Sequence, residues 1–180
     1  ESIVRGIYRS VHIKVYPLVF ISDIFIKTYT SDSTMSFDVW ISNNSGQDRQ
    51  IKINGNLSSW NKDLWDYPAI PGTLIDVKAG ETTKASVGPF TWTPGNGSWW
   101  WPNVPYREGF RTKLHFLNLT LKEEEVCIHN AQIRFGFREI RQAGKYFELN
   151  GLRVNFRGDN LQVANYDRVR SEERRVGKEC

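Results

Sequence analysis

Large aromatic side chains gather in the middle of the chain, and their residue types are the best suited to bind a ligand. They are Trp60, Trp65, Tyr67, Phe90, Trp92, Trp99, Trp100, Trp101 and Tyr106. Flat aromatic faces stack on the C–H faces of sugar rings, so the cluster fits a carbohydrate-binding platform. Each such side chain also buries roughly 150–250 Å², so the cluster suits a sandwich core and its seam with a neighbouring domain. A platform needs several exposed, coplanar indoles, whereas a scaffold buries most of them. We favour the scaffold.

Histidine and cysteine offer no pattern for a metal site or a disulfide framework. The three histidines, His12, His115 and His129, are scattered, and the two cysteines, Cys127 and Cys180, lack ligand spacing. Cys127 is expected to be a small buried residue of a strand. The sequence therefore predicts neither a metal nor a cofactor.

The charge distribution argues against nucleic-acid and membrane partners. The net charge is +4, and basic residues are densest between Arg134 and Arg157. There they alternate with apolar residues, which is typical of the solvent face of half-buried strands rather than of a basic patch with interleaved aromatics. No window approaches the roughly 18 apolar residues of a membrane span.

The elements that must position the aromatic cluster are predicted by a two-residue alternation of apolar and polar side chains. The expected strands are Val19–Thr30, Thr34–Asn43, Gln50–Leu57, Thr73–Val77, Thr82–Trp92, Thr112–Leu121 and Val126–Phe137. The segment Trp60–Gly72 is irregular and is expected to be a long loop with a helical turn. Short strands at this spacing, with no amphipathic helix between them, predict an all-β fold, an immunoglobulin-like β-sandwich.

A basic connector and a hairpin are expected after the last of these strands. Phe147-Glu148-Leu149 and Leu152–Phe156 flank Asn150-Gly151. This dipeptide is a strong signal for a two-residue type I′ turn, which requires positive φ at both central residues. The second hairpin strand ends in Arg157-Gly158-Asp159-Asn160.

The order of these motifs resembles glycoside hydrolase family 2, the β-galactosidase, β-glucuronidase and β-mannosidase group. Gly136-Phe137-Arg138 resembles the end of the family's sandwich domain, Leu149-Asn150-Gly151 its linker hairpin, and Arg157–Asn160 the opening of its catalytic barrel. Gly6–Val11 resembles the strand that closes the family's jelly-roll domain. Trp99–Tyr106 resembles a segment that packs against the sheet and the barrel in that family, which assigns interdomain packing to Trp99, Trp100, Trp101 and Tyr106.

The resemblance implies a chain of four parts. Residues 1–16 would end a jelly-roll sugar-binding domain, 17–140 would form the immunoglobulin-like sandwich, and 141–169 would form the linker hairpin and the first strand of a truncated TIM barrel. Residues 170–180 are densely charged and lack periodicity. They resemble translated vector sequence, so we expect an artefactual tail there.

No residue of this chain is predicted to be catalytic. Retaining glycosidases need two carboxylates about 5–5.5 Å apart, and in family 2 the acid/base glutamate follows an asparagine. The chain contains no Asn-Glu pair. The run Glu123-Glu124-Glu125 is expected at a solvated hairpin tip, and Glu139 and Glu148 are expected to be surface ion-pair partners of arginines.

Substrate contacts are implied by the resemblance at one place, and only within a full-length chain. Arg157, Asp159, Asn160 and Gln162 would lie at the end of the first barrel strand, where barrel active sites are built. Gln162 stands where the family has a histidine that helps line the sugar pocket. Arg157 is equally compatible with a structural role in the barrel floor.

Three functions are compatible with these observations. The first is the non-catalytic immunoglobulin-like part of a retaining exo-β-glycosidase, whose carbohydrate substrate binds in a missing barrel and which packs against jelly-roll and barrel domains. The second is a stand-alone carbohydrate-binding sandwich that uses the Trp-rich segment. The third, an adhesion-type immunoglobulin domain, does not account for the Leu149–Gly151 and Arg157–Asn160 motifs. The compartment is undecided, and a periplasmic or secreted location is compatible with the sequence.

Overall fold

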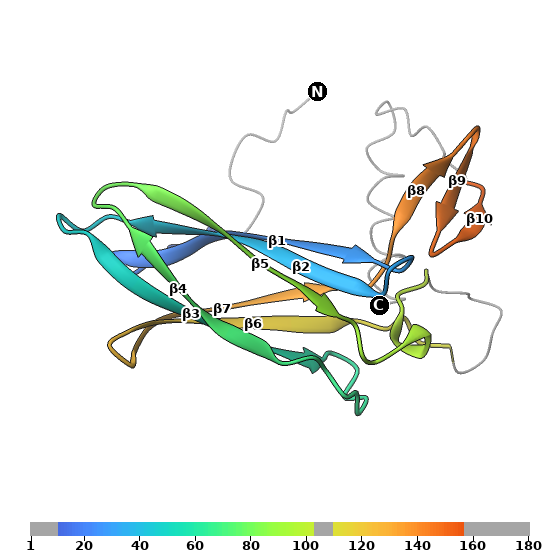
Figure 1. Ribbon diagram of the computed structural model, residues 1–180, viewed down its shortest axis with the longest axis horizontal. Helices are drawn as coiled ribbons and strands as arrows, with labels where there is room; N and C mark the ends of the chain where they lie inside the picture. The colour runs from blue at the N-terminus through green and yellow to red at the C-terminus, as the bar shows by residue number, and fades with distance from the viewer. Residues whose placement is uncertain (1–10, 103–109, 157–180) are drawn as a thin grey trace, which may run out of the picture.

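The structure, a computed structural model, describes residues 11–102 and 110–156 (Figure 1). The chain is all-β in these ranges apart from one turn of 3-10 helix, Asn96–Ser98. The strands are β1 (Val19–Tyr29), β2 (Thr34–Asn43), β3 (Arg49–Ser59), β4 (Ile70–Val77), β5 (Thr82–Thr91), β6 (His115–Glu123), β7 (Val126–Phe135), β8 (Ile140–Ala143), β9 (Tyr146–Leu149) and β10 (Leu152–Val154).

Two antiparallel sheets form an immunoglobulin-like β-sandwich, as the sequence predicts. One sheet has the order β1-β2-β5 and the other the order β4-β3-β6-β7, and Figure 1 shows the two sheets facing each other. β1 and β7 lie at neighbouring edges of the two sheets, where side chains close this side of the sandwich.

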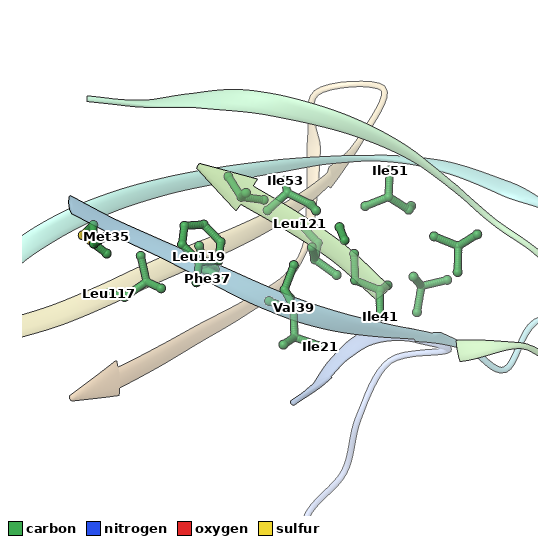
Figure 2. Close-up of a cluster of buried hydrophobic side chains, with 14 of the residues drawn as sticks. Ile21, Met35, Phe37, Val39, Ile41, Ile51, Ile53, Leu117, Leu119 and Leu121 are labelled. Atoms are coloured by element: carbon green, nitrogen blue, oxygen red, sulfur yellow. The ribbon is translucent and has the colours of Figure 1, made fainter. Parts of the chain in front are cut away.

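The core lies between the sheets because each strand turns alternate residues inward. In β2 these residues are Met35, Phe37, Val39 and Ile41, all fully buried. β3 contributes Ile51 and Ile53 and β6 contributes Leu117, Leu119 and Leu121, so that branched aliphatic side chains from both sheets interdigitate (Figure 2).

The predicted hairpin is confirmed, and the predicted connector is wrong. Asn150 has φ 51° and Gly151 has φ 78°, the positive values of a type I′ turn between β9 and β10. The segment expected to be a connector includes strand β8, which pairs with β9. The result is a third, small sheet with the order β10-β9-β8.

The loop between β3 and β4 contains no helical turn. A turn at Trp60 and Asn61 is followed by irregular chain, and β4 begins at Ile70, three residues earlier than predicted. Lys62 has φ 64°. This left-handed backbone conformation turns the chain away from the direction of β3 and does not continue into a right-handed helix.

Cys127 is exposed, and the prediction that it is buried is wrong. Its register partner is Lys122 on the outer face of β6, after a register shift between Leu121 and Lys122. Side chains directly opposite each other in an antiparallel pair share a face, so Cys127 points to solvent.

Residues 11–17 form no strand among the described residues, and Val11, Ile13 and Val15 are exposed. The rest of the segment expected to end a jelly-roll domain lies outside the described residues. In the described part of the chain no helix has the length and apolar character of a membrane span.

Candidate functional site: the junction between sandwich and hairpin

Asn150 attaches the small sheet β8-β9-β10 to the sandwich. Its side chain donates from Nδ2 to the carbonyl of Trp100 (2.9 Å) and accepts at Oδ1 from the backbone N–H of Glu139 (2.9 Å). Its own backbone N–H donates to the carbonyl of Glu139 (2.8 Å). One buried residue thus supplies the left-handed turn conformation, two bonds that extend the pairing of β8 with β9, and one bond across the junction to the sandwich.

Trp100 lies directly on Gly136. A Cβ at position 136 would approach Cγ of the Trp100 ring to 2.5 Å, so only glycine fits there. The backbone N–H of Trp100 donates to the carbonyl of Phe137 (2.9 Å). The guanidinium of Arg138 lies 4.4 Å from the centre of the Trp100 ring, within the range of a cation–π contact.

Phe137 anchors the junction in the core. Its side chain is fully buried and stacks on Trp92, with ring centroids 4.3 Å apart and an interplanar angle of 19°. Trp92 donates from Nε1 to the hydroxyl of Ser98 (2.8 Å). The motif that ends the sandwich therefore contacts two tryptophans. Gly136 and Arg138 contact Trp100, and Phe137 stacks on Trp92.

Glu139 is not the arginine partner that the sequence predicts. Among the described residues its carboxylate accepts from the hydroxyl of Thr30 (3.2 Å) and the backbone N–H of Ser31 (2.9 Å). Burial raises the pKa of this carboxyl and the bonds from Ser31 and Thr30 lower it, with a net shift downward. Glu148 does form the predicted ion pair, with Arg141 at 2.8 Å.

A buried polar network centred on His115 contacts the aromatic side chains Tyr67 and Trp92. His115 is fully buried and its Nε2 lies 2.9 Å from the carbonyl of Ser98. Because that carbonyl can only accept, Nε2 carries the proton and Nδ1 accepts from the hydroxyl of Tyr67 (2.7 Å). Desolvation by burial lowers the pKa of His115, against the raising effect of the bond to Ser98.

The neutral His115 predicts that stability falls as the pH falls below about 6.5. The folded chain resists protonation while the unfolded chain binds a proton at the ordinary pKa of 6.5, so the free energy of unfolding decreases toward acid. The slope contributed by this one group is at most about 1.4 kcal/mol per pH unit. Urea unfolding between pH 7.5 and pH 5 measures it.

His115→Gln is the variant that isolates this effect, because an amide can donate to Ser98 and accept from Tyr67 without titrating. We expect a flatter pH dependence, with a remainder from His129, whose pKa burial also lowers. An unchanged slope in the variant would contradict the assignment.

The structure describes some of the predicted site residues. Trp99, Trp100 and Trp101 are half-buried and do not form an exposed platform, and Trp100 lies at the junction. Tyr106, Arg157, Asp159, Asn160 and Gln162 lie outside the described residues. No group of three or more His, Cys, Asp or Glu side chains suitable for a metal occurs in ranges 11–102 and 110–156.

Beside the junction, a groove of about 550 Å³ runs between the edges of β1 and β7. Phe25 and Tyr29 line it from β1, and Arg134, Arg138 and Ile140 line it from the end of β7 and the start of β8. A hydrogen bond joins the two sides of the groove, because the hydroxyl of Thr28 accepts from the backbone N–H of Arg138 (3.2 Å). The groove is an open surface feature rather than an enclosed pocket.

Comparisons with solved structures bear on this architecture. The chain resembles a family 2 β-galacturonidase from Eisenbergiella tayi bound to galacturonate (TM-score 0.57, 19% identity, 76% of this chain and 22% of that one). It resembles Bacteroides uniformis β-glucuronidase 2 (0.56, 21%, 79% and 17%) and a family 2 member from Bacteroides cellulosilyticus DSM 14838 (0.63, 15%, 81% and 19%). The chain has a fold that occurs in family 2 glycoside hydrolases. It spans about a fifth of the length of these enzymes. No protein-family model and no curated protein matches the chain.

Proposed function

We propose that this chain is the non-catalytic, immunoglobulin-like part of a retaining exo-β-glycosidase of family 2. The observation that carries the proposal is the junction, where Asn150 bonds both to Trp100 of the sandwich and to Glu139 at the start of the small sheet. These bonds hold the β9–β10 turn in a fixed position on the sandwich. This supports the proposal, because a domain that follows β10 would need a defined position relative to the sandwich.

In this proposal, residues 1–16 end a jelly-roll domain and residues 141–169 lead through the hairpin into the first barrel strand. Arg157, Asp159 and Asn160 then stand at the end of that strand and contact the sugar together with Gln162. Trp99, Trp100, Trp101 and Tyr106 serve interdomain packing. The catalytic glutamates lie on later barrel strands beyond this chain.

The exposed apolar side chains of the small sheet support packing against further domains. Phe147, Leu152 and Phe156 are exposed on β9, on β10 and just after β10, and the rings of Phe147 and Phe156 meet edge-on at 5.4 Å. Clustered apolar side chains at a surface mark contact sites. We assign them to contact with the barrel.

A second candidate function is a stand-alone carbohydrate-binding module. Trp99–Trp101 do not support it, because all three are half-buried. Trp60 does, because about half of its surface is exposed (48%).

Hydrolysis of model glycosides distinguishes a non-catalytic part of an enzyme from the complete enzyme. The 180-residue chain is expected to leave a panel of nitrophenyl β-glycosides, including the β-glucuronide and the β-galactoside, unhydrolysed. The same chain extended through its natural reading frame is expected to hydrolyse at least one of them. Hydrolysis by the 180-residue chain alone would contradict the proposal.

A further inference from the structure

The outer face of the sheet β4-β3-β6-β7 carries a block of uncharged polar side chains, which we name the amide face. Its members are Asn54, Asn56 and Ser58 of β3, Asn118 and Thr120 of β6, and Asn130 and Gln132 of β7. They point outward because the residues between them in β3 and β6 turn inward, toward the core. No charged side chain lies among the six outward residues of β3, β6 and β7 from Asn54 to Gln132 that form the two rows described below, whereas in the neighbouring row Ser58 lies opposite Phe116 and Phe116 opposite Arg134.

The strand register arranges these side chains in rows. Asn56, Asn118 and Gln132 lie opposite one another on β3, β6 and β7. Two residues further along the sheet, Asn54, Thr120 and Asn130 form a second row. Rows of this kind repeat about every 7 Å along a strand and span about 10 Å across three strands, so the polar groups are regularly spaced.

Hydrogen bonds within the first row fix the direction of its amides. Asn118 donates from Nδ2 to Oδ1 of Asn56 (2.8 Å) and to the hydroxyl of Ser58 (3.2 Å). It accepts at Oδ1 from Nε2 of Gln132 (2.6 Å). Both Nδ2 donors of the central amide are thereby used. Among the described residues no partner takes the Nδ2 donors of Asn56 or the Oε1 acceptor of Gln132, so donors and an acceptor stand at opposite ends of one row.

An exposed indole lies beyond the rows, on the far side of the row formed by Ser58, Phe116 and Arg134. Trp60 follows β3 and contacts Phe116 of β6 edge-on, with centroids 5.3 Å apart and an interplanar angle of 69°. The guanidinium of Arg134 lies 4.5 Å from the centre of the Trp60 ring. Both contacts hold the ring in place, and about half of its surface stays open to solvent.

The chemistry of this surface fits one class of ligand. A saccharide offers hydroxyl groups that both donate and accept, together with apolar C–H faces that stack on an indole. Nucleic acid requires several free cations, whereas Lys52 and Lys122 both pair with Glu125 and Arg134 is the single cation beside Trp60. The centres of protein interfaces are rich in aromatic and apolar side chains, whereas these rows consist of amides and hydroxyls.

We propose that the amide face and Trp60 together bind a neutral oligosaccharide. One sugar ring lies against the exposed part of Trp60. Hydroxyl groups of the oligosaccharide accept from Nδ2 of Asn56 and donate to Oε1 of Gln132. This binding site is separate from the junction and from any barrel. It would hold a polymeric substrate or a glycan beside the enzyme without taking part in its hydrolysis.

Isothermal titration calorimetry of the 180-residue chain with cellohexaose, xylohexaose and mannohexaose tests this site. We expect saturable binding of at least one hexasaccharide, accompanied by a change in tryptophan emission. Trp60→Ala is expected to weaken that binding at least about tenfold. Gln132→Ala, an exposed position with little influence on folding, is expected to weaken it about two- to tenfold.

Trp40→Ala is the matched control, because Trp40 lies on the outer face of the opposite sheet, beside Lys84 (5.2 Å). It is expected to bind as the parent chain does. Absence of binding to all three hexasaccharides, or binding that Trp60→Ala and Gln132→Ala leave unchanged, would overturn the proposal. A positive result stands even if the extended reading frame hydrolyses no glycoside, so the two proposals fail separately.

Discussion

Replacing Phe137 with alanine is expected to lower the free energy of unfolding by about 3–5 kcal/mol, the usual loss for a fully buried phenylalanine. Phe137 is completely buried, and its ring stacks on Trp92, so the truncation leaves a cavity lined by aromatic rings. Trp92 in turn bonds to Ser98 and contacts His115. Loss of the Phe137 ring therefore loosens the network that holds the junction.

Urea unfolding followed by tryptophan emission measures this loss. Phe25→Ala is the matched control, because it removes the same ring from an exposed position on β1. The control is expected to change stability by no more than about 0.5 kcal/mol. A loss below about 1 kcal/mol for Phe137→Ala would show that the junction does not depend on this side chain.

Gly136→Ala is expected to destabilise the chain by about 2–3 kcal/mol, although it adds a single methyl group. The added Cβ would lie 2.5 to 2.6 Å from Cγ, Cβ and Cδ1 of Trp100, atoms at the base of the side chain that cannot swing aside. Trp100 must then leave its position, together with its bond to Phe137 and its contact with Arg138. Overpacking of this kind costs typically 1–3 kcal/mol.

Two further variants isolate the clash as the cause. Gly46→Ala places a methyl group where nothing lies within 4 Å, so its stability is expected to change by no more than about 0.5 kcal/mol. In a Trp100→Ala background the clash is absent, and Gly136→Ala should then destabilise much less than in the parent chain. Equal effects of Gly136→Ala in both backgrounds would contradict the packing of Trp100 on Gly136.

The sandwich could be predicted because its signals are local. In β2, Met35, Phe37, Val39 and Ile41 alternate with Ser36, Asp38 and Trp40, and a period of two residues with one buried face specifies a strand. The turn at Asn150-Gly151 is equally predictable from the sequence, because these two residue types favour the positive φ that the turn requires. The alternation of apolar and polar residues does not predict strand β8, because this strand is four residues long and mostly exposed. Its pairing with β9 makes it a strand.

The junction could be predicted only in part. The motif Gly136–Arg138 marked the place, but nothing local to Gly136 indicates that Trp100 lies on it. Nothing local to Asn150 indicates that its amide reaches the carbonyl of Trp100, 50 residues earlier. The ion-pair role that the sequence predicts for Glu139 is wrong for the same reason. Its neighbours in sequence are basic, but the groups it binds are Thr30 and Ser31, just after the end of β1.

The measurement that tests the central claim most directly is the contiguous reading frame on both sides of this chain. We expect several hundred further residues downstream of Val169, with an Asn-Glu pair and a second glutamate at the ends of alternating strand–helix units. Such a frame would supply the two carboxylates that glycoside hydrolysis requires. A natural stop codon soon after Val169 would contradict the account of this chain as part of a glycosidase.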